Sequence, residues 1–432
     1  MTSLEQLGAF VATCDPDDRA RTEARLHTTD TIGAWIAARG TEEGRRLLAF
    51  RDSDDSLLNH IAINVSLARL SEVDDIHLQA MITPGAIVVP AALTLAANLN
   101  ADAKNVAAAI VAGYEAMVRL GVAIDGPTVL YRGIWPTYFA APFSVAAVAA
   151  RLLGLDEKQS AHALATALIM AAPGTGHHAA SSTARWLAVG YAASRGLQAA
   201  LSAKAGFTSD VKLAEGEFLK NVFGITPNVD PLAGGLGALA LSQVSFKPWC
   251  AARQTMAATQ ALRELLASGI DASSIARIGV AVLPPHLKMI NHGVTPGDRF
   301  SHLTSLQYQM AVAALTPEEA YSLGGPSGSV SPALSSFMAR VQVRAEEGLM
   351  AAGYPQAWPA HVTVTAAGRH ERTVTHVPGD PARAFSQADL KDKFTRVVGP
   401  MLGQERAEAA FSEAMTATDR PGDVLRLIDQ RP

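Results

Sequence analysis

The stretch "DAKNVAAAIVAGYEAMVRLG", Asp102 to Gly121, decides the class of fold. Alanine and larger apolar residues recur in it at the three- and four-residue spacing of a helix face. Aspartate commonly caps the start of a helix and glycine commonly follows its end, so the predicted helix starts after Asp102 and ends before Gly121. Small residues on several faces indicate close packing against neighbouring helices.

The same helical spacing of small and apolar residues extends over most of the chain. Helical spacing continues from Thr28 to about Leu241, and "DEKQSAHALATALIMAA" after Asp156 repeats the pattern. The tail "SQADLKDKFTRVVGPML" returns to helix, with Ser386 as its predicted N-cap. The sequence therefore predicts a mainly α protein.

Beyond Phe246 the pattern changes. Residues 275–284, "IARIGVAVLP", and 361–377, "HVTVTAAGRHERTVTHV", alternate with the period of strands, and "AAG" is a hairpin turn. A helix-like run, "SLQYQMAVAAL", lies between them. We expect a helical domain over residues 1–244, completed by 396–432, and an α+β lid domain over 245–395.

Composition narrows the class of protein. The chain has 432 residues, 49% hydrophobic and 18% charged, with a formal net charge of −4, which is typical of a folded protein of two domains. No dense run of Lys and Arg suits a nucleic-acid backbone, so nucleic acid is not an expected partner. The two cysteines, Cys14 and Cys250, lack zinc or disulfide spacing, so no metal is expected.

The sequence also predicts the cellular location of the protein. The start "MTSLEQLGAF" lacks the charged and apolar regions of a secretion signal, so a cytoplasmic protein is expected. Residues 133–150 form an uncharged run of nearly membrane-spanning length. Because Pro136 and Pro142 interrupt this run, it is interpreted as a buried helix, and no membrane partner is expected.

Seven segments, taken in order, resemble the MmgE/PrpD family, which includes 2-methylcitrate dehydratase, cis-aconitate decarboxylase and iminodisuccinate epimerase. They are "TDTIGAWIA" (29–37), "SEVDDIHLQAMITPGAIVVPA" (71–91), "RGIWPTYFAAPFSVAAVAARLLGLDEKQ" (132–159), "ARWLAVGYAASRGLQAALSAKAGFTS" (184–209), "KPWCAARQTMAA" (247–258), "SLQYQMAVAAL" (305–315) and "PGDPARAFSQADLKDKF" (378–394). The resemblance implies a helical domain with an α+β lid, a homodimer, and a cleft that handles small anionic polycarboxylic acids without metal or organic cofactor.

The chain departs from the family pattern at four histidine positions. Thr83 stands before Pro-Gly, Trp135 stands in "GIWPT", and Ala188 and Met256 replace the other two. Lys247 is retained. Because the family's standard substrates depend on these positions, the departures favour a different carboxylic acid.

The implied chemistry removes a proton next to a carboxylate. Such a proton is weakly acidic, so the enzyme must hold the carboxylates with cations and supply a base. Arg132, Arg185 and Arg253 are candidate carboxylate clamps, because the guanidinium fork binds carboxylate oxygens in pairs. Lys247 is a further clamp or a base whose pKa is lowered by burial. Each of these could equally be a surface residue that points to water.

The acidic cluster "EVDDIH" offers acid and base groups. Glu72 and Asp75 are candidate catalytic residues, because paired carboxylates can raise one pKa. Asp75 could instead cap a helix or hold a turn, which is the commoner role of Asp in a loop. His77 and Thr83 are candidate substrate-binding residues. Thr83 occupies the lost histidine position, and His77 lies near it in the sequence.

Two further segments supply candidates. Tyr138 is a candidate proton donor, and Trp135 a candidate wall of the site, although aromatic residues in such a run more often only pack. His178, with its neighbour His177, lies in a Gly/Ser loop and could restore an acid or base function.

These residues together predict a cofactor-independent lyase, of the dehydratase or decarboxylase type, that acts on a small di- or tricarboxylic acid. Two alternatives stay open. One is an isomerase or epimerase that uses the same proton abstraction, and the other is a carboxylate-binding relative without catalytic activity.

Overall fold

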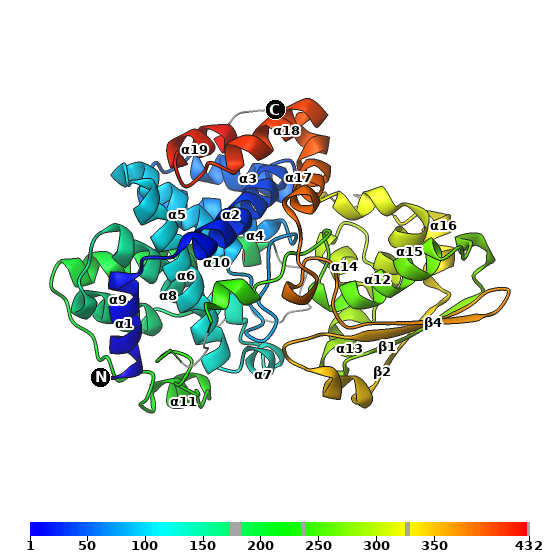
Figure 1. Ribbon diagram of the computed structural model, residues 1–432, viewed down its shortest axis with the longest axis horizontal. Coiled ribbons are helices and arrows are strands. Elements are labelled where there is room, and N and C mark those ends of the chain that lie inside the picture. The colour runs from blue at the N-terminus through cyan, green and yellow to red at the C-terminus, as the bar shows by residue number, and fades with distance from the viewer. Residues whose placement is uncertain (173–182, 235–237, 325–328, 430–432) are drawn as a thin grey trace. The chain divides into compact units, whose positions relative to one another are not determined.

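The computed structural model describes residues 1–172, 183–234, 238–324 and 329–429 (Figure 1). The chain divides into two compact units: Met1–Phe246 with Ser386–Pro432, and Lys247–Phe385. The chain is mainly α, with a large helical unit and a smaller α+β unit, as predicted. The unit boundaries lie at 246/247 and 385/386, whereas 244/245 and 395/396 were expected.

The helical unit contains the first eleven α-helices and the last three. They are α1 (Ser3–Thr13), α2 (Asp18–Ala38), α3 (Glu42–Arg51), α4 (Leu57–Leu70), α5 (Gly85–Leu99), α6 (Ala103–Ala123), α7 (Gly126–Tyr131), α8 (Pro136–Leu152), α9 (Glu157–Ile169), α10 (Ala184–Lys204), α11 (Phe218–Phe223), α17 (Gln387–Leu402), α18 (Gln404–Ala414) and α19 (Pro421–Asp429), with the short 3-10 helix η1 (Ala240–Gln243).

Helix α6 begins as predicted and ends later than predicted. The Asp102 carboxylate accepts a hydrogen bond from the backbone N–H of Asn105 at 2.9 Å, which makes it the N-cap. Gly121 does not end the helix, which continues to Ala123. A Cβ on Gly121 would lie 2.8 Å from the Ala80 Cβ. This glycine therefore permits close packing, and the helix stops before Asp125, which has a left-handed φ of 53°.

Close helix packing explains the many small residues. A Cβ on Gly190 of α10 would lie 1.9 Å from the Ala62 carbonyl oxygen of α4. On the same helix, a Cβ on Gly196 would lie 2.3 Å from the Pro142 carbonyl oxygen of α8. Helix α10 can therefore approach both neighbours only because glycine stands at these two positions.

Helix α17 connects the C-terminal segment to the helical unit. The Ser386 hydroxyl caps α17 by accepting from the backbone N–H of Asp389 at 3.2 Å, as predicted. Lys393, buried on α17, donates to Asp30 Oδ1 of α2 at 2.5 Å and to the Val73 carbonyl at 3.0 Å. Because this contact lies within the first half of α17, the unit boundary falls before the helix, at 385/386.

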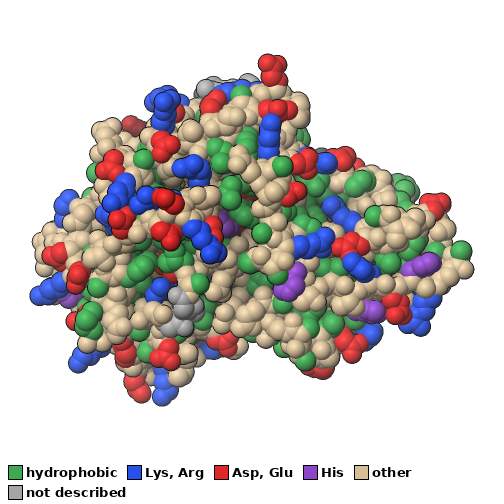
Figure 2. Space-filling view, in the orientation of Figure 1, with side chains coloured by type: hydrophobic (Ala, Val, Ile, Leu, Met, Phe, Trp, Pro, Cys, Tyr) green, Lys and Arg blue, Asp and Glu red, His purple; other side chains and the backbone are tan. Residues whose placement is uncertain are grey.

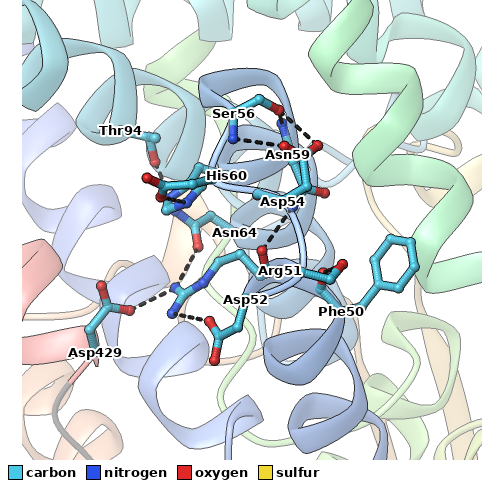
Figure 3. Close-up of polar contacts among 12 residues, drawn as sticks. Phe50, Arg51, Asp52, Asp54, Ser56, Asn59, His60, Asn64, Thr94 and Asp429 are labelled. Carbon is cyan, nitrogen blue, oxygen red and sulfur yellow. Dashed lines mark hydrogen bonds and ion pairs between the residues drawn. The ribbon is translucent and has the colours of Figure 1, made fainter.

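Helix α19 is held by a polar network at the end of α3 (Figure 3). Arg51 donates to Asp429 Oδ1 at 2.7 Å. Asn59 donates to the carbonyl oxygens of Arg51 at 3.0 Å and Asp54 at 2.7 Å, which fixes the turn between α3 and α4. The network thus joins the last described helix to the third and fourth.

Long apolar helices form the core of the helical unit. By length and composition, helix α6 could cross a membrane. However, 94% of the apolar stretch that meets this criterion is buried inside the protein. Helix α8 covers the uncharged run at 133–150, and its residues from Pro136 to Ala150 are buried. The prediction of a buried helix there is confirmed.

The α+β unit is built on a four-stranded sheet of order β2-β1-β3-β4. Its strands are β1 (Arg277–Val282), β2 (Val341–Ala345), β3 (Ala360–Thr365) and β4 (Arg369–Val374). Strand β1 pairs antiparallel with β3, and β3 and β4 form the predicted hairpin. Strand β2, parallel to β1, was not predicted, and its partner strand lies far away in the sequence.

Helices cover this sheet and enclose a second core. They are α12 (Arg253–Ala267), α13 (Pro284–Ile290), α14 (Arg299–Thr304), α15 (Leu306–Leu315) and α16 (Pro332–Met338), with the 3-10 helices η2 (Ala272–Ser274), η3 (Pro317–Tyr321), η4 (Glu347–Ala352) and η5 (Pro381–Arg383). Helix α12 packs along β3 and β4 (Figure 1). Met256 and Leu262 of this helix share the core with Ile278, Val280 and Val362.

Candidate active site

The loop between α4 and α5, residues 71–84, carries the acidic candidates. Glu72 and Met81 have left-handed φ angles of 57° and 55°, which non-glycine residues adopt only when their surroundings hold them there. Ile76 exchanges two backbone hydrogen bonds with Ser245, of 2.9 and 2.8 Å. The loop is therefore a fixed, buried structure and not a mobile connection.

Arg69, at the end of α4, gathers two carboxylates of this loop. Its guanidinium lies 2.9 Å from Glu72 Oε1 and 3.5 Å from Asp74 Oδ1, and all three side chains are buried. Burial alone would lower the pKa of Arg69, but Asp74 and Glu72 raise it above its usual value. Arg69 therefore stays charged, and this position was missed by sequence reasoning although it stands three residues before Glu72.

Tyr138, in the first turn of α8, lies within the electric field of Arg69 and Arg185. Its phenol is buried, and burial raises its pKa to about 12 even though both arginines act to lower it. Glu72 and Asp74 also raise this pKa. Tyr138 is therefore a neutral phenol at any physiological pH and can donate a hydrogen bond.

Arg185, at the start of α10, is held between indole rings. Its guanidinium carbon lies 5.4 Å from the Trp135 ring centroid and 5.8 Å from that of Trp186. Arg69 lies 5.8 Å from the same Trp186 ring. We call Arg69, Arg185, Glu72, Asp74, Tyr138, Trp135 and Trp186 the arginine cluster.

Thr83 belongs to the border of this cluster. Its backbone N–H donates to the Thr137 hydroxyl oxygen at 3.2 Å, and the two hydroxyl oxygens lie 3.4 Å apart. Because Thr137 immediately precedes Tyr138, these contacts join the end of the acidic loop to the helix that carries the phenol. Both hydroxyl groups are buried polar groups beside the cluster.

Asp75 lies in a different environment. One carboxylate oxygen accepts from His27 Nδ1 at 2.8 Å and from the Tyr114 hydroxyl at 2.7 Å, and the other accepts from the Gly85 backbone N–H at 2.8 Å. Burial, and then the charge of Asp75, raise the pKa of Tyr114 well above its usual value. This carboxylate therefore joins α2, α5 and α6, and its catalytic role remains a prediction.

His27 was missed by sequence reasoning, because it reads as one polar residue within the helical pattern of α2. Its ring stacks on Phe246, with centroids 4.2 Å apart and planes inclined by 13°. Phe246 is the last residue of the N-terminal segment of the helical unit. The residue that follows it in the chain is Lys247, which is buried.

His77 stabilises the loop from within. Its Nδ1 accepts from the Ala80 backbone N–H at 3.1 Å. Burial lowers its pKa to about 4, so the ring is neutral near pH 7. A neutral imidazole that accepts a hydrogen bond from its own loop is suited to holding a turn, and substrate binding by His77 remains a prediction.

The two other arginine candidates have protein partners. Arg132, on the surface, donates to the Gly224 carbonyl at 3.1 Å and the Phe223 carbonyl at 3.2 Å. Arg253, buried at the start of α12 in the α+β unit, donates to both carboxylate oxygens of Asp380 at 2.9 and 2.7 Å. These contacts give each side chain a structural role, and no observation tests their binding of substrate. His177 and His178 lie outside the described residues.

The comparisons with known proteins bear on the whole chain. The model of the MmgE/PrpD N-terminal domain matches residues 56–224, and the model of the MmgE/PrpD C-terminal domain matches residues 249–417. A comparison with curated proteins found no match. The C-terminal family domain includes α17 and α18, which fold with the helical unit. The two matches together cover most of the sequence, and the chain belongs to the MmgE/PrpD family.

Proposed function

We propose that this protein is a cofactor-independent lyase that removes a proton next to a carboxylate of a small di- or tricarboxylic acid. Its family includes lyases such as 2-methylcitrate dehydratase. The observation that carries the proposal is the arginine cluster, in which Arg185 and Arg69 act on the buried phenol of Tyr138. Loss of water or of carbon dioxide would complete the reaction.

The arginines supply the electrostatic part of this chemistry. When the proton leaves, negative charge moves onto the carboxylate oxygens of the substrate, and a fixed cation lowers the energy of that state. Arg185 is suited to this role because two indole rings hold its guanidinium in place. A buried site also strengthens the attraction, because little water screens it.

The remaining groups divide the proton transfers among them. Tyr138 is neutral and can donate a hydrogen bond or a proton to the developing charge. The candidate general bases are Lys247, Glu72 and His178, of which His178 lies outside the described residues. Glu72 lies 2.9 Å from the Arg69 guanidinium, which holds the carboxylate in place.

A variant pair tests the arginine. We expect Arg185→Ala to lower turnover of the acid found by screening di- and tricarboxylates by about 100-fold or more, and Arg185→Lys to restore only part of it, because lysine lacks the planar fork. The matched control is Arg195→Ala on the exposed side of the same helix. Activity of Arg185→Ala within twofold of the unmodified protein would remove the cluster from the mechanism.

Epimerisation is the second candidate, and Trp135 favours it. This residue stands where the family resemblance leads one to expect histidine, and its ring contacts Arg185. A tryptophan cannot protonate a leaving hydroxyl group, and epimerisation releases no such group. The carbon is instead reprotonated on its other face, for which Tyr138 is the candidate donor. NMR in deuterium oxide distinguishes the two, because an epimerase exchanges the substrate proton without net loss of water or carbon dioxide.

A binding protein without catalytic activity is the third possibility. It would show a rise in melting temperature with a dicarboxylate, but neither proton exchange nor turnover.

We further propose that the protein is a homodimer in the cytoplasm. Light scattering coupled to size-exclusion chromatography checks the dimer, and a monomer at micromolar concentration contradicts it.

A further inference from the structure

The α+β unit contains a cavity that the proposed function does not use. Its volume is about 220 Å³, and its walls include Cys250, Arg299, His302, Tyr308, Val312 and Glu319. A cavity of about 150 Å³ can hold benzene, and pockets for drug-sized ligands usually span about 300–1,000 Å³. The space therefore suits a small metabolite rather than a cofactor.

One buried nitrogen in this cavity has an unmet hydrogen bond. His302 Nδ1 donates to the Asp298 carbonyl oxygen at 2.9 Å, and in the tautomer with its proton on Nδ1 the other nitrogen, Nε2, is an acceptor. Nε2 is buried and has no hydrogen-bond partner among the described residues. Because an unsatisfied buried polar atom costs free energy, a molecule in the cavity that donates a hydrogen bond to this nitrogen would be favoured.

The ring of His302 is held in place by its neighbours. Tyr308 packs edge-on against it, with ring centroids 4.9 Å apart and planes at 89°. Gln309 donates through its side chain to the His302 carbonyl oxygen at 3.0 Å. The acceptor is therefore preorganised and does not need to move when a ligand binds.

The charges of the wall define the ligand further. Arg299 supplies a guanidinium group, which favours a carboxylate. Burial, and then the charge of Glu319, raise the pKa of Tyr308 to about 12, so its phenol is a neutral donor for a second carboxylate oxygen. Glu319 lies on the exposed side of the wall and would repel a second carboxylate. Val312 adds an apolar surface for an aliphatic chain.

We propose that this cavity binds a short aliphatic monocarboxylic acid with a hydroxyl or amino group next to the carboxylate. The carboxylate faces Arg299 and Tyr308, and the hydroxyl or amino group donates to His302 Nε2. This site consists of α+β-unit residues alone. It does not depend on the arginine cluster or on the proposed lyase activity.

Calorimetric titration of the full-length protein tests the proposal with three acids of one carbon skeleton. We expect 2-hydroxybutyrate or 2-aminobutyrate to bind, and butyrate, which lacks the donor, to bind about tenfold more weakly. Whichever of the first two acids binds more tightly identifies the donor group. Both outcomes support the site.

Two variants connect this binding to the cavity. His302→Asn keeps a side-chain N–H for the Asp298 carbonyl, but its shorter side chain has no acceptor at the position of Nε2, so we expect the tenfold preference over butyrate to disappear. Val312→Phe fills the cavity and should abolish binding of all three acids. The matched control is His370→Asn, on the exposed strand β4, and melting temperature checks that each variant is folded.

Two results would overturn the inference. If neither substituted acid binds at concentrations that saturate millimolar sites, the cavity holds only water. If binding occurs but is unchanged in both His302→Asn and Val312→Phe, the acid binds elsewhere. Loss of lyase activity in Arg185→Ala, by contrast, should leave this titration unchanged, so the two proposals fail separately.

Discussion

Asp75 and Glu72 are buried carboxylates of one short loop, and they serve different ends. Asp75 accepts hydrogen bonds from residues of α2, α5 and α6. Glu72 pairs with a permanently charged arginine and lies in the field that acts on Tyr138. The first arrangement joins three helices through hydrogen bonds to one carboxylate, whereas the second pairs a carboxylate with an arginine close to Tyr138. Proximity in sequence therefore does not imply a shared role.

The largest expected effect on stability comes from removing Asp75. We expect Asp75→Ala to lower the free energy of unfolding by about 3–5 kcal/mol, because the donors on His27, Tyr114 and Gly85 lose their buried acceptor. Urea unfolding followed by circular dichroism measures this. Asp55→Ala, at a fully exposed side chain, is the control and should cost less than about 0.5 kcal/mol. A loss below about 1 kcal/mol at Asp75 would contradict its structural role.

His77 is expected to make the stability of the folded protein depend on pH. Its folded pKa of about 4 lies below the ordinary value of 6.5, so the unfolded chain binds the proton more tightly. The stability that it contributes is present above pH 6.5 and is lost as pH falls toward 4, by about 3 kcal/mol.

His77→Asn can still accept from the Ala80 N–H but does not titrate in this range, so we expect its acid unfolding midpoint to shift to lower pH. Unfolding measured in buffers from neutral to acidic pH checks this shift. An unchanged midpoint would mean that the ring does not stay neutral in the folded state. His370→Asn, at an exposed ring on β4, is the control and should not move the midpoint.

Tyr138 and Tyr114 allow a second test of the difference between the surroundings of Glu72 and Asp75. Tyr138→Phe should lower turnover by about 100-fold, because the neutral donor beside the arginines is lost. Tyr114→Phe should lower stability by about 1–3 kcal/mol instead, because it removes one donor to Asp75. Kinetics and urea unfolding of both variants separate the two roles. Equal turnover in Tyr138→Phe and the unmodified protein would exclude the phenol from the reaction.

The smallest expected effect is at Arg132. Its contacts to the Phe223 and Gly224 carbonyls lie on the surface. We therefore expect Arg132→Ala to cost less than about 1 kcal/mol of stability. Turnover should stay within twofold, against the large loss expected for Arg185→Ala. A large loss of turnover would return Arg132 to the substrate-binding set.

Much of the fold could be predicted because it depends on local patterns. The caps at Asp102 and Ser386 and the hairpin at 361–377 follow from residue types at short spacing. The missed strand β2 and the position of Gly121 depend on partners far away in the sequence. A glycine that ends a helix and one that admits a neighbour look alike in a single sequence.

The sequence by itself determined that this protein is mainly helical, that an α+β unit follows Phe246, and that it resembles the MmgE/PrpD family, because periodicity and motif order are local properties. Only the tertiary structure decided which candidates meet. It placed Arg69 and Trp186 beside Arg185 and Tyr138, and it gave Asp75 hydrogen-bond partners on three helices. The physical reason is that a buried charge takes its role from the partners that surround it, and folding brings those partners from distant helices.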